Sequence, residues 1–380
     1  MKKLYKIVIG LLVLALAITA CAPAAVEEPA AAEEAVEEAV EEVVEEVVEE
    51  EPTKIGVSMS ASSSERWVRE GDFLEKDLEA LGYEVDLQFA EDDVQVQISQ
   101  LENMMTGGAK ALIINPIDNA ALGTVLQTAA DNGVYVVAYD RLIIDTPNVD
   151  YHVTFHNVNV GKGMVAAVAE EQGWDEDNDE VFNVEFFTGS PDDSNAFTAY
   201  DGITQGLQPY LDSGKVVVLS GQTEFDQVSI LGWSQETAQK RMEDLISGFY
   251  SGGEKLNAAF SPSDGLSFGI ESALELAGYT YGEDWPLITG QDCDIFAVKN
   301  IISGRRYLSM YRDGRVESAH ATAAVDALLK GEEPEVNSTD FDNNVKVVPT
   351  FVLDATPVTL DNYEEVLIEG GYYTAAELEE

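Results

Sequence analysis

Residues 134–141 read Val-Tyr-Val-Val-Ala-Tyr-Asp-Arg, and this stretch shows the plan of the folded region. An apolar run without polar alternation indicates a strand that is buried on both faces, as in a parallel sheet covered by helices. The run ends in a carboxylate and a guanidinium. Ligands of open α/β sheets bind beyond the carboxyl ends of the strands, so Asp140 and Arg141 stand where a binding site is expected.

Short apolar runs alternate with longer segments of helical period on both sides of this stretch, as in parallel α/β units. After a passage near residues 151–157 the same rhythm restarts. The repeat predicts an α/β protein with two Rossmann-like lobes, each built on a parallel sheet. The strands are predicted at residues 55–59, 85–89, 111–115 and 134–139, and then at 181–187, 216–219, 258–261 and 287–290, with helices such as 67–81 and 97–105 between them.

The two lobes are expected to be joined by a hinge of three crossovers, because no long Gly/Ser linker separates them. The crossovers are predicted near residues 155–158, 308–312 and 339–347. This assigns residues 53–157 plus 311–340 to an N-terminal lobe and residues 158–310 plus 341–380 to a C-terminal lobe.

Polar and aromatic side chains gather at the ends of six predicted strands, in a mixture that suits a sugar. Carboxylates accept hydrogen bonds from hydroxyls, guanidinium and amide groups donate to them, and indoles cover the apolar C–H face of the ring. Structural alternatives stay open. Asp140 and Arg141 could form an ion pair, Asp193 and Asp264 could be helix N-caps, and the two tryptophans could be core residues. The candidate residues are Arg66, Trp67, Asp140, Arg141, Asp193, Asn195, Trp233, Asp264 and Asp292.

Several segments carry a family resemblance. They are Glu-Arg-Trp at 65–67, Gln-Leu-Glu-Asn-Met at 100–104, Ala-Tyr-Asp-Arg-Leu at 138–142, Gly-Ser-Pro-Asp-Asp at 189–193, Pro-Tyr-Leu-Asp-Ser-Gly-Lys at 209–215, Ser-Asp at 263–264 and Thr-Gly-Gln-Asp at 289–292. From about Lys54 onward the chain resembles the xylose-binding and multiple-sugar-binding proteins of bacterial ABC transporters, which are type I periplasmic binding proteins. Asn-Val-Lys-Val-Val-Pro at 344–349 and Glu-Gly-Gly-Tyr-Tyr at 369–373 look especially like the multiple-sugar-binding members.

The resemblance implies two lobes that close over a monosaccharide. Ser194 and Ser263 stand where xylose binders often have asparagine, and Arg312 stands where lysine is usual, so the family's sugar preference does not transfer safely. Xylose, glucose, galactose and arabinose all remain candidates. By resemblance, hydroxyls would be held by Arg66, Asp140, Arg141, Asn195 and Asp292, the ring would stack on Trp67 and Trp233, and Asp193, Asp264 and Arg312 would add polar contacts.

The first residues have the layout of an export signal. Lysines precede an apolar run in residues 1–20, and Ile18-Thr19-Ala20-Cys21 resembles the lipobox of bacterial lipoproteins, where the cysteine receives a lipid. An ordinary signal peptide with a chance cysteine is the alternative. Residues 21–52 are interpreted as the lipidated cysteine and an acidic, solvated tether, although an acidic partner-binding segment also fits the composition.

The formal net charge of −50 makes nucleic acid an unfavourable partner.

With Cys21 lipidated, Cys293 would have no intramolecular disulfide partner, and we interpret it as a packing residue whose thiol ionises less readily beside carboxylates. The acidic residues 175–179 resemble the start of a calcium loop, but the glycine expected next is Glu180, so a solvated loop is favoured. Neither a metal nor a cofactor is predicted.

The sequence therefore predicts a monomeric, lipid-anchored solute-binding protein on the periplasmic or extracellular face of a membrane. It would capture a monosaccharide and deliver it to an ABC permease and its ATPase. The alternative is a sugar sensor that signals to a membrane kinase or chemoreceptor. No catalytic residues are predicted, because an enzyme acting on the sugar would need a paired acid and base.

Overall fold

The computed structural model describes residues 52–177 and 179–379, which fall within one compact unit, Glu51–Glu380. The predicted export signal, lipidated Cys21 and all of the predicted tether except Pro52 lie outside the described residues, as does Asn178 of the acidic loop. Within the part that the structure describes, none of the helices has the length and apolar character needed to span a membrane.

The first lobe is a six-stranded parallel sheet with the strand order β11-β5-β4-β3-β1-β2. Separate apolar clusters lie under its two helical layers, one beneath α1 and α10 and the other beneath α2 and α3. The strand β3, near the middle of this sheet, is buried along its whole length, as its apolar sequence predicts. The strands are β1 (Lys54–Met59), β2 (Glu84–Phe89), β3 (Ala111–Ile114), β4 (Tyr135–Tyr139), β5 (Tyr151–Phe155) and β11 (Thr350–Leu353), and the helices are α1 (Glu65–Ala80), α2 (Val94–Thr106), α3 (Gly123–Asp131) and α10 (Gly314–Lys330).

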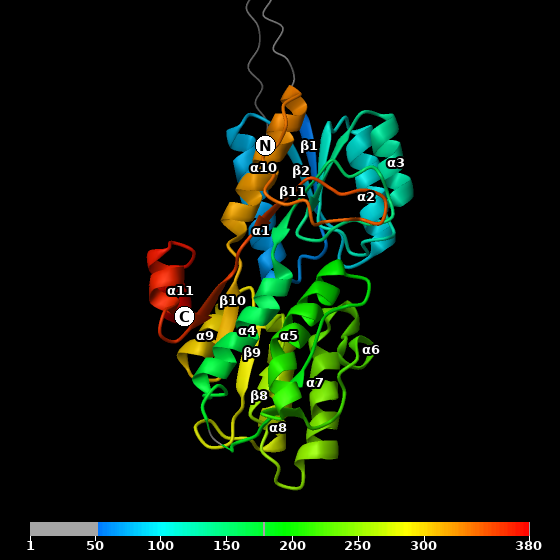
Figure 1. Cartoon of the computed structure of the whole chain (residues 1–380). Coiled ribbons are helices and arrows are strands. Elements are labelled where there is room, and N and C mark those ends of the chain that lie inside the picture. The colour runs from blue at the N-terminus through cyan, green and yellow to red at the C-terminus, as the bar shows by residue number, and fades with distance from the viewer. Residues whose placement is uncertain (1–51, 178, 380) are drawn as a thin grey trace, which may run out of the picture. The chain divides into compact units, whose positions relative to one another are not determined.

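The second lobe repeats this plan with the strand order β12-β10-β9-β8-β6-β7, in which β12 alone pairs antiparallel to its neighbour. Figure 1 shows the lobes one above the other, with α4, α5, α7 and α8 around the lower sheet. The strands are β6 (Phe182–Phe186), β7 (Val216–Val218), β8 (Ala258–Phe260), β9 (Leu287–Gln291), β10 (Leu308–Tyr311) and β12 (Thr356–Thr359). The helices are α4 (Asn157–Glu171), α5 (Ser194–Ser213), α6 (Phe225–Val228), η1 (Leu231–Trp233), α7 (Gln235–Leu245), η2 (Ile246–Tyr250), α8 (Asp264–Ala277), α9 (Ile295–Ile302), η3 (Glu364–Glu369) and α11 (Ala375–Glu379).

The prediction of two α/β lobes with parallel sheets is confirmed, and each strand predicted from the sequence is present. Two boundaries were wrong. Residues 341–380 were assigned to the C-terminal lobe, but β11 pairs with β5 of the first sheet, so the third crossover lies between β11 and β12 and not at residues 339–347. Tyr311 was assigned to the N-terminal lobe, but it ends β10 and belongs to the second sheet.

Several helices follow a strand after a short loop and are capped by a serine or aspartate side chain. Ser64 caps α1, Asp193 caps α5 and Ser263 caps α8, each by accepting a hydrogen bond from a backbone N–H of the first turn. These caps fix where the helices start, and they place the first turns of α1 and α5 at the edge where the two lobes face each other (Figure 1).

His152 in β5 gives the fold a dependence on pH. The ring is buried, 3.4 Å from the carbonyl oxygen of Asp140 and 3.4 Å from Thr350 Oγ1 of β11, and burial lowers its pKa from 6.5 to about 4. The folded form therefore holds a neutral ring, while the unfolded chain takes up a proton below pH 6.5.

We expect the free energy of unfolding to be highest above pH 6.5 and to fall by about 1.4 kcal/mol per pH unit down to pH 4 through this one group. Urea unfolding at pH 7.0, 5.5 and 4.5 should show a steeper loss of stability in the wild type than in His152→Gln. Equal slopes in the two proteins would contradict this account.

Candidate functional site

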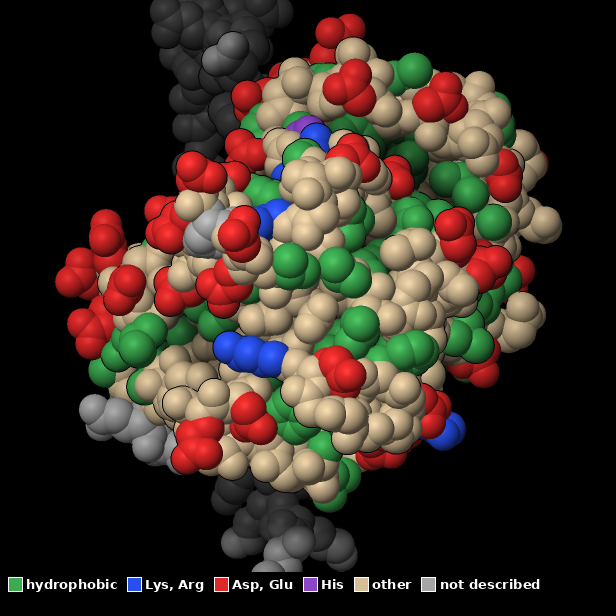
Figure 2. Space-filling view, turned by 60° about the horizontal axis from the view of Figure 1, so that its bottom comes forward, with side chains coloured by type: hydrophobic (Ala, Val, Ile, Leu, Met, Phe, Trp, Pro, Cys, Tyr) green, Lys and Arg blue, Asp and Glu red, His purple; other side chains and the backbone are tan. Residues whose placement is uncertain are grey.

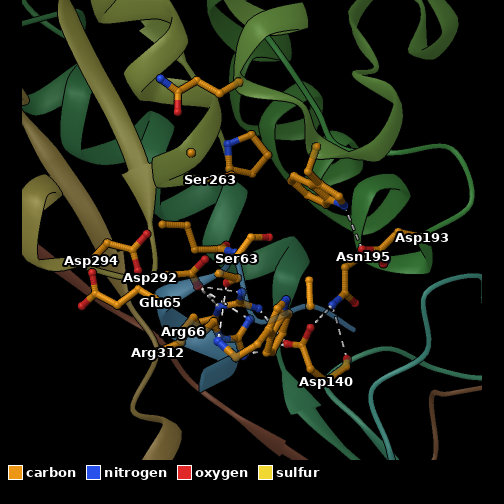
Figure 3. Close-up of a pocket in the computed structure, with 18 of the residues that line it drawn as sticks. Ser63, Glu65, Arg66, Asp140, Asp193, Asn195, Ser263, Asp292, Asp294 and Arg312 are labelled. Carbon is orange, nitrogen blue, oxygen red and sulfur yellow. Dashed lines mark hydrogen bonds and ion pairs between the residues drawn. The ribbon is translucent and has the colours of Figure 1, made fainter. Parts of the chain in front are cut away.

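A cavity of about 560 Å³ lies between the lobes and is lined by residues from both. Nine of the ten residues proposed from the sequence line it, and Asp264 does not. Figure 3 shows the labelled side chains converging from the two sides. The nine are Arg66, Trp67, Asp140, Arg141, Asp193, Asn195, Trp233, Asp292 and Arg312.

Asp140 is the centre of the charged network. Its Oδ1 lies 3.0 Å from Arg66 Nη2 and 2.9 Å from Arg312 Nη1, and its Oδ2 accepts a hydrogen bond of 2.9 Å from Asn195 Nδ2. Burial raises the pKa of this carboxyl, but the guanidinium groups of Arg66 and Arg312 outweigh burial and leave the pKa below its usual value. Asp140 is therefore a carboxylate that can accept further hydrogen bonds.

The predicted alternative of an ion pair between Asp140 and Arg141 is wrong. Arg141 instead lies with its Nε 2.8 Å from Asp193 Oδ2, on the opposite lobe. Asp193 does cap α5, accepting from Asn195 N at 2.8 Å, so it both ends the loop and lines the cavity.

Arg66 is held by carboxylates on several sides. Its Nε donates to Glu70 Oε1 of α1 at 2.7 Å, and its Nη2 donates to Glu317 Oε2 of α10 at 3.0 Å. Its Nη1 lies 3.6 Å from Asp292 Oδ1 of the second lobe and has no hydrogen-bond partner among the described residues. This buried nitrogen is a donor available to a ligand at the cavity wall.

The two tryptophans line the cavity in different ways. Trp67 belongs to the apolar cluster of the first lobe and carries the Arg66 guanidinium 4.2 Å from its ring centre. Trp233 is half-buried, and its Nε1 donates to Asp193 Oδ2 at 3.0 Å. Gly189 leaves room for that indole, since a Cβ there would lie 1.9 Å from the ring. Core packing and a cavity-facing surface are thus combined in both residues.

Asp264 is corrected to a structural role. Arg306 Nη1 donates to its Oδ1 at 2.6 Å, Ser309 Oγ donates at 2.9 Å, and the backbone N–H of Asp294 donates to Oδ2 at 2.9 Å. Burial raises the pKa of Asp264 to about 7, although Arg306 opposes the shift. Its oxygens fix the turn after β9 and do not face the cavity; the cap of α8 is Ser263.

Left-handed backbone geometry recurs at the site. Asp140 has φ 61°, Trp233 has φ 52° and Asp292 has φ 101°. Residues other than glycine rarely adopt these positive backbone angles. Such strain persists where surrounding contacts hold it, and it is common at ligand sites. Here it turns three predicted residues away from their strands or loops into the cavity.

The sequence reasoning missed several lining residues. Gln291 is only 5% exposed, and its Oε1 has no hydrogen-bond partner within the described chain. Glu65 and Asn157 also line the wall, the latter donating to Asn195 Oδ1 at 2.9 Å. Gln291 directly precedes Asp292, so the same strand-end rule applied to the whole end of β9 would have found it.

The cavity wall carries more negative than positive charge. Its three arginines pair with carboxylates of the protein, whereas Asp294 is left among other acids. Burial raises the pKa of Asp294 well above its usual value, and the nearby Asp264, Asp292 and Glu65 add to the shift. Acidic side chains also dominate the charged groups of the face in Figure 2, a surface that repels polyanions.

Cys293 is fully buried in an apolar cluster, and burial raises the pKa of its thiol well above the usual value. This confirms its predicted role as a packing residue. Among residues 52–177 and 179–379, no group of three or more His, Cys, Asp or Glu side chains is arranged to hold a metal ion.

A family model described as a periplasmic binding protein domain matches residues 55–333. The chain belongs to this family. It is a family of binding proteins, which confirms that the chain is not an enzyme. The multiple sugar-binding periplasmic receptor ChvE of Rhizobium radiobacter is 47% identical over 328 residues, covering 85% of this chain and 92% of that protein.

Two further comparisons support the same family. The D-xylose-binding periplasmic protein of Escherichia coli is 31% identical over 327 residues, covering 86% of this chain and 92% of that protein. The crystal structure of an ABC transporter solute binding protein from Clostridium phytofermentans, with bound β-D-glucose, is 41% identical and superposes with a TM-score of 0.82, covering 86% of this chain and 100% of that one.

Proposed function

We propose that this protein captures a monosaccharide between its lobes and delivers it to an ABC permease. The observation that carries the proposal is two buried polar atoms at the cavity, Arg66 Nη1 and Gln291 Oε1, that have no hydrogen-bond partner within the described chain. A buried donor or acceptor without a partner costs about 1–3 kcal/mol, and a sugar hydroxyl would remove that cost. The relatives named for sugars, and the similar protein solved with glucose, support the choice of ligand.

The chemistry of the wall suits hydroxyl groups. Asp140 and Asp292 accept hydrogen bonds, Arg66 and Asn195 donate them, and the Trp233 indole offers a flat apolar face. The cavity volume of about 560 Å³ lies within the usual range for small-molecule sites. A sugar that lacked one expected hydroxyl would leave a buried partner unsatisfied, which is the basis of selectivity.

Closure of the lobes has direct contacts to build on. Asn195 of α5 binds Asp140 beyond β4, and the backbone N–H of Asn119 donates to the Asp192 carbonyl at 3.2 Å. A ligand held by both lobes would favour the closed form through its differential contacts. The closed face would then be the one recognised by the permease.

The proposal includes export and a lipid on Cys21, which would keep the binding protein close to its permease. Metabolic labelling with a radioactive fatty acid, lost in Cys21→Ser, tests the anchor. A sensory role is the second candidate, and the name "receptor" of the Rhizobium radiobacter relative favours it. In that case the closed form would dock on a membrane kinase or chemoreceptor.

A thermal-shift panel of xylose, glucose, galactose, arabinose, ribose and fucose tests the ligand class. A chain that begins at Pro52 keeps all the residues that the structure describes. A ligand at about a hundred times its dissociation constant adds roughly 2.7 kcal/mol, so the best sugar should raise the Tm by several degrees. No shift with any of the six sugars would contradict the proposal.

Trp233→Ala should raise the Kd of the best sugar about tenfold, because an indole face is lost from the wall. Trp285→Ala is the matched control: this partly buried indole donates to the Arg305 carbonyl at 2.7 Å and lies outside the cavity lining. Isothermal titration should show an unchanged Kd in the control. An unchanged Kd in Trp233→Ala would remove that residue from the site.

A further inference from the structure

The last part of the chain, residues 360–379, is anchored on the second lobe, and we call it the C-terminal segment. Its Leu367, Tyr373 and Leu378 pack in one apolar cluster with Val298 and Ile301 of α9. Figure 1 shows α11 beside α9 in the lower lobe. Burial of this kind holds the segment to the second lobe whatever the first lobe does.

The same segment contacts the first lobe through cation–π contacts and a hydrogen bond. The guanidinium of Arg69, on α1, lies 4.4 Å from the ring centre of Tyr373 and 5.0 Å from that of Tyr372. Arg315, on α10, donates from Nη1 to the carbonyl oxygen of Gly370 at 3.0 Å and lies 5.3 Å from the Tyr372 ring. The helices α1 and α10 of the first lobe thus both contact the Gly-Gly-Tyr-Tyr stretch at residues 370–373 of the segment.

Glu65 connects these contacts to the first turn of α9. Its Oε1 lies 3.1 Å from the Tyr373 hydroxyl, which also lies 2.8 Å from the Cys293 carbonyl oxygen. The carboxylate accepts from the backbone N–H of Ile295 at 3.2 Å and pairs with Arg69 at 3.1 Å. The first turn of α1 is therefore tied to the second lobe directly and through the C-terminal segment.

We propose that the C-terminal segment is a latch that stabilises the closed arrangement of the lobes and strengthens the binding of every sugar by the same factor. Its apolar side stays with the second lobe, while its contacts with Arg69, Arg315 and Glu65 can break when the lobes part. Arg69, Tyr372 and Tyr373 are outside the described cavity lining, so they act on the closing equilibrium and not on the sugar. Apparent affinity scales with the population of the binding-competent form. The inference rests on the proposed function only in taking a sugar as the ligand.

Arg69→Ala and Tyr373→Phe test the latch. Tyr363→Phe is the matched control, since this tyrosine lies in the same segment and its hydroxyl contacts the adjacent Glu364 at 3.1 Å. We expect Arg69→Ala to raise the Kd about three- to tenfold, by the same factor for D-glucose and D-xylose, mainly through faster dissociation. Tyr373→Phe should act in the same direction more weakly, and the control should match the wild type.

Small-angle X-ray scattering without sugar gives a second readout, in which Arg69→Ala should have a larger radius of gyration than the wild type. An unchanged Kd in both latch variants would overturn the inference. A factor that differs between the two sugars would also overturn it, because the effect would then reach the sugar through the wall residue Glu65 and not through closing. If the wild type bound no sugar, the proposed function would fail. The scattering comparison alone would then decide on the latch, and equal radii would reject it.

Discussion

Replacing Asp140 with alanine is expected to abolish measurable sugar binding and to lower the free energy of unfolding by about 3 kcal/mol. The substitution would remove one of the two carboxylates that the buried Arg66 and Arg312 guanidinium groups share, and leave them only Asp292 in common. Arg66 keeps Glu70 and Glu317 as partners, which limits the loss of stability. Binding should suffer more, because Asp140 also holds Asn195 of the other lobe.

Two further variants define the Asp140 result. Asp140→Asn keeps the shape of the side chain and should lose less stability than the alanine variant. Asp326→Ala removes a carboxylate of the same lobe that pairs with Lys330 at the surface, so it should cost less than about 1 kcal/mol and leave the Kd unchanged. Chemical unfolding and titration calorimetry measure both quantities. Sugar binding by Asp140→Ala within tenfold of the wild type would contradict the proposed position of the ligand.

Gly189→Ala is expected to weaken sugar binding tenfold to a hundredfold although it adds one methyl group. A Cβ at this position would lie 1.9 Å from Trp233 Cζ2 and 2.1 Å from Cη2, which is far inside van der Waals contact. The indole must then leave its place beside Asp193, at a cost of about 1–3 kcal/mol of stability. Gly123→Ala is the matched control, because no atom lies within 4 Å of an added Cβ there.

The double variant Gly189→Ala/Trp233→Ala separates this clash from other effects. Without the indole the added methyl group has room, so the double variant should have the stability of Trp233→Ala alone. If the two losses of stability simply added, the methyl group would be colliding with something other than Trp233, and the explanation would be wrong.

The fold could be predicted well from the sequence because each buried parallel strand is a short apolar run followed by a polar residue. The carboxyl ends of such strands meet at one edge, which is why residues as distant as Arg66 and Asp292 could be grouped before the structure was known. Four strands were missed: β5 and β10, which lie at or beside predicted crossovers, and β11 and β12. Each has four or five residues, and β12 contains Pro357, which is tolerated because this strand lies at the edge of its sheet.

The partners of the charged residues could not be predicted in the same way. Asp264 occupies a strand-end position like the others, but Arg306, 42 residues further along the chain, occupies its carboxylate. Asp140 likewise pairs with arginines 74 and 172 residues away, and not with the adjacent Arg141. Sequence position indicates which side chains can approach the cavity. Tertiary packing decides which of them pair with one another and are then unavailable to a ligand.

The late position of β11 and β12 affects how the chain is made. One strand completes the first sheet and the other completes the second, and they are separated only by residues 354 and 355. Until residue 353 leaves the ribosome, the fully buried β5 is an exposed edge of the first sheet, and until residue 359 does so the second sheet lacks its edge strand. Synthesis in this order keeps the nascent chain unfinished, which suits a protein that we propose crosses a membrane before it folds.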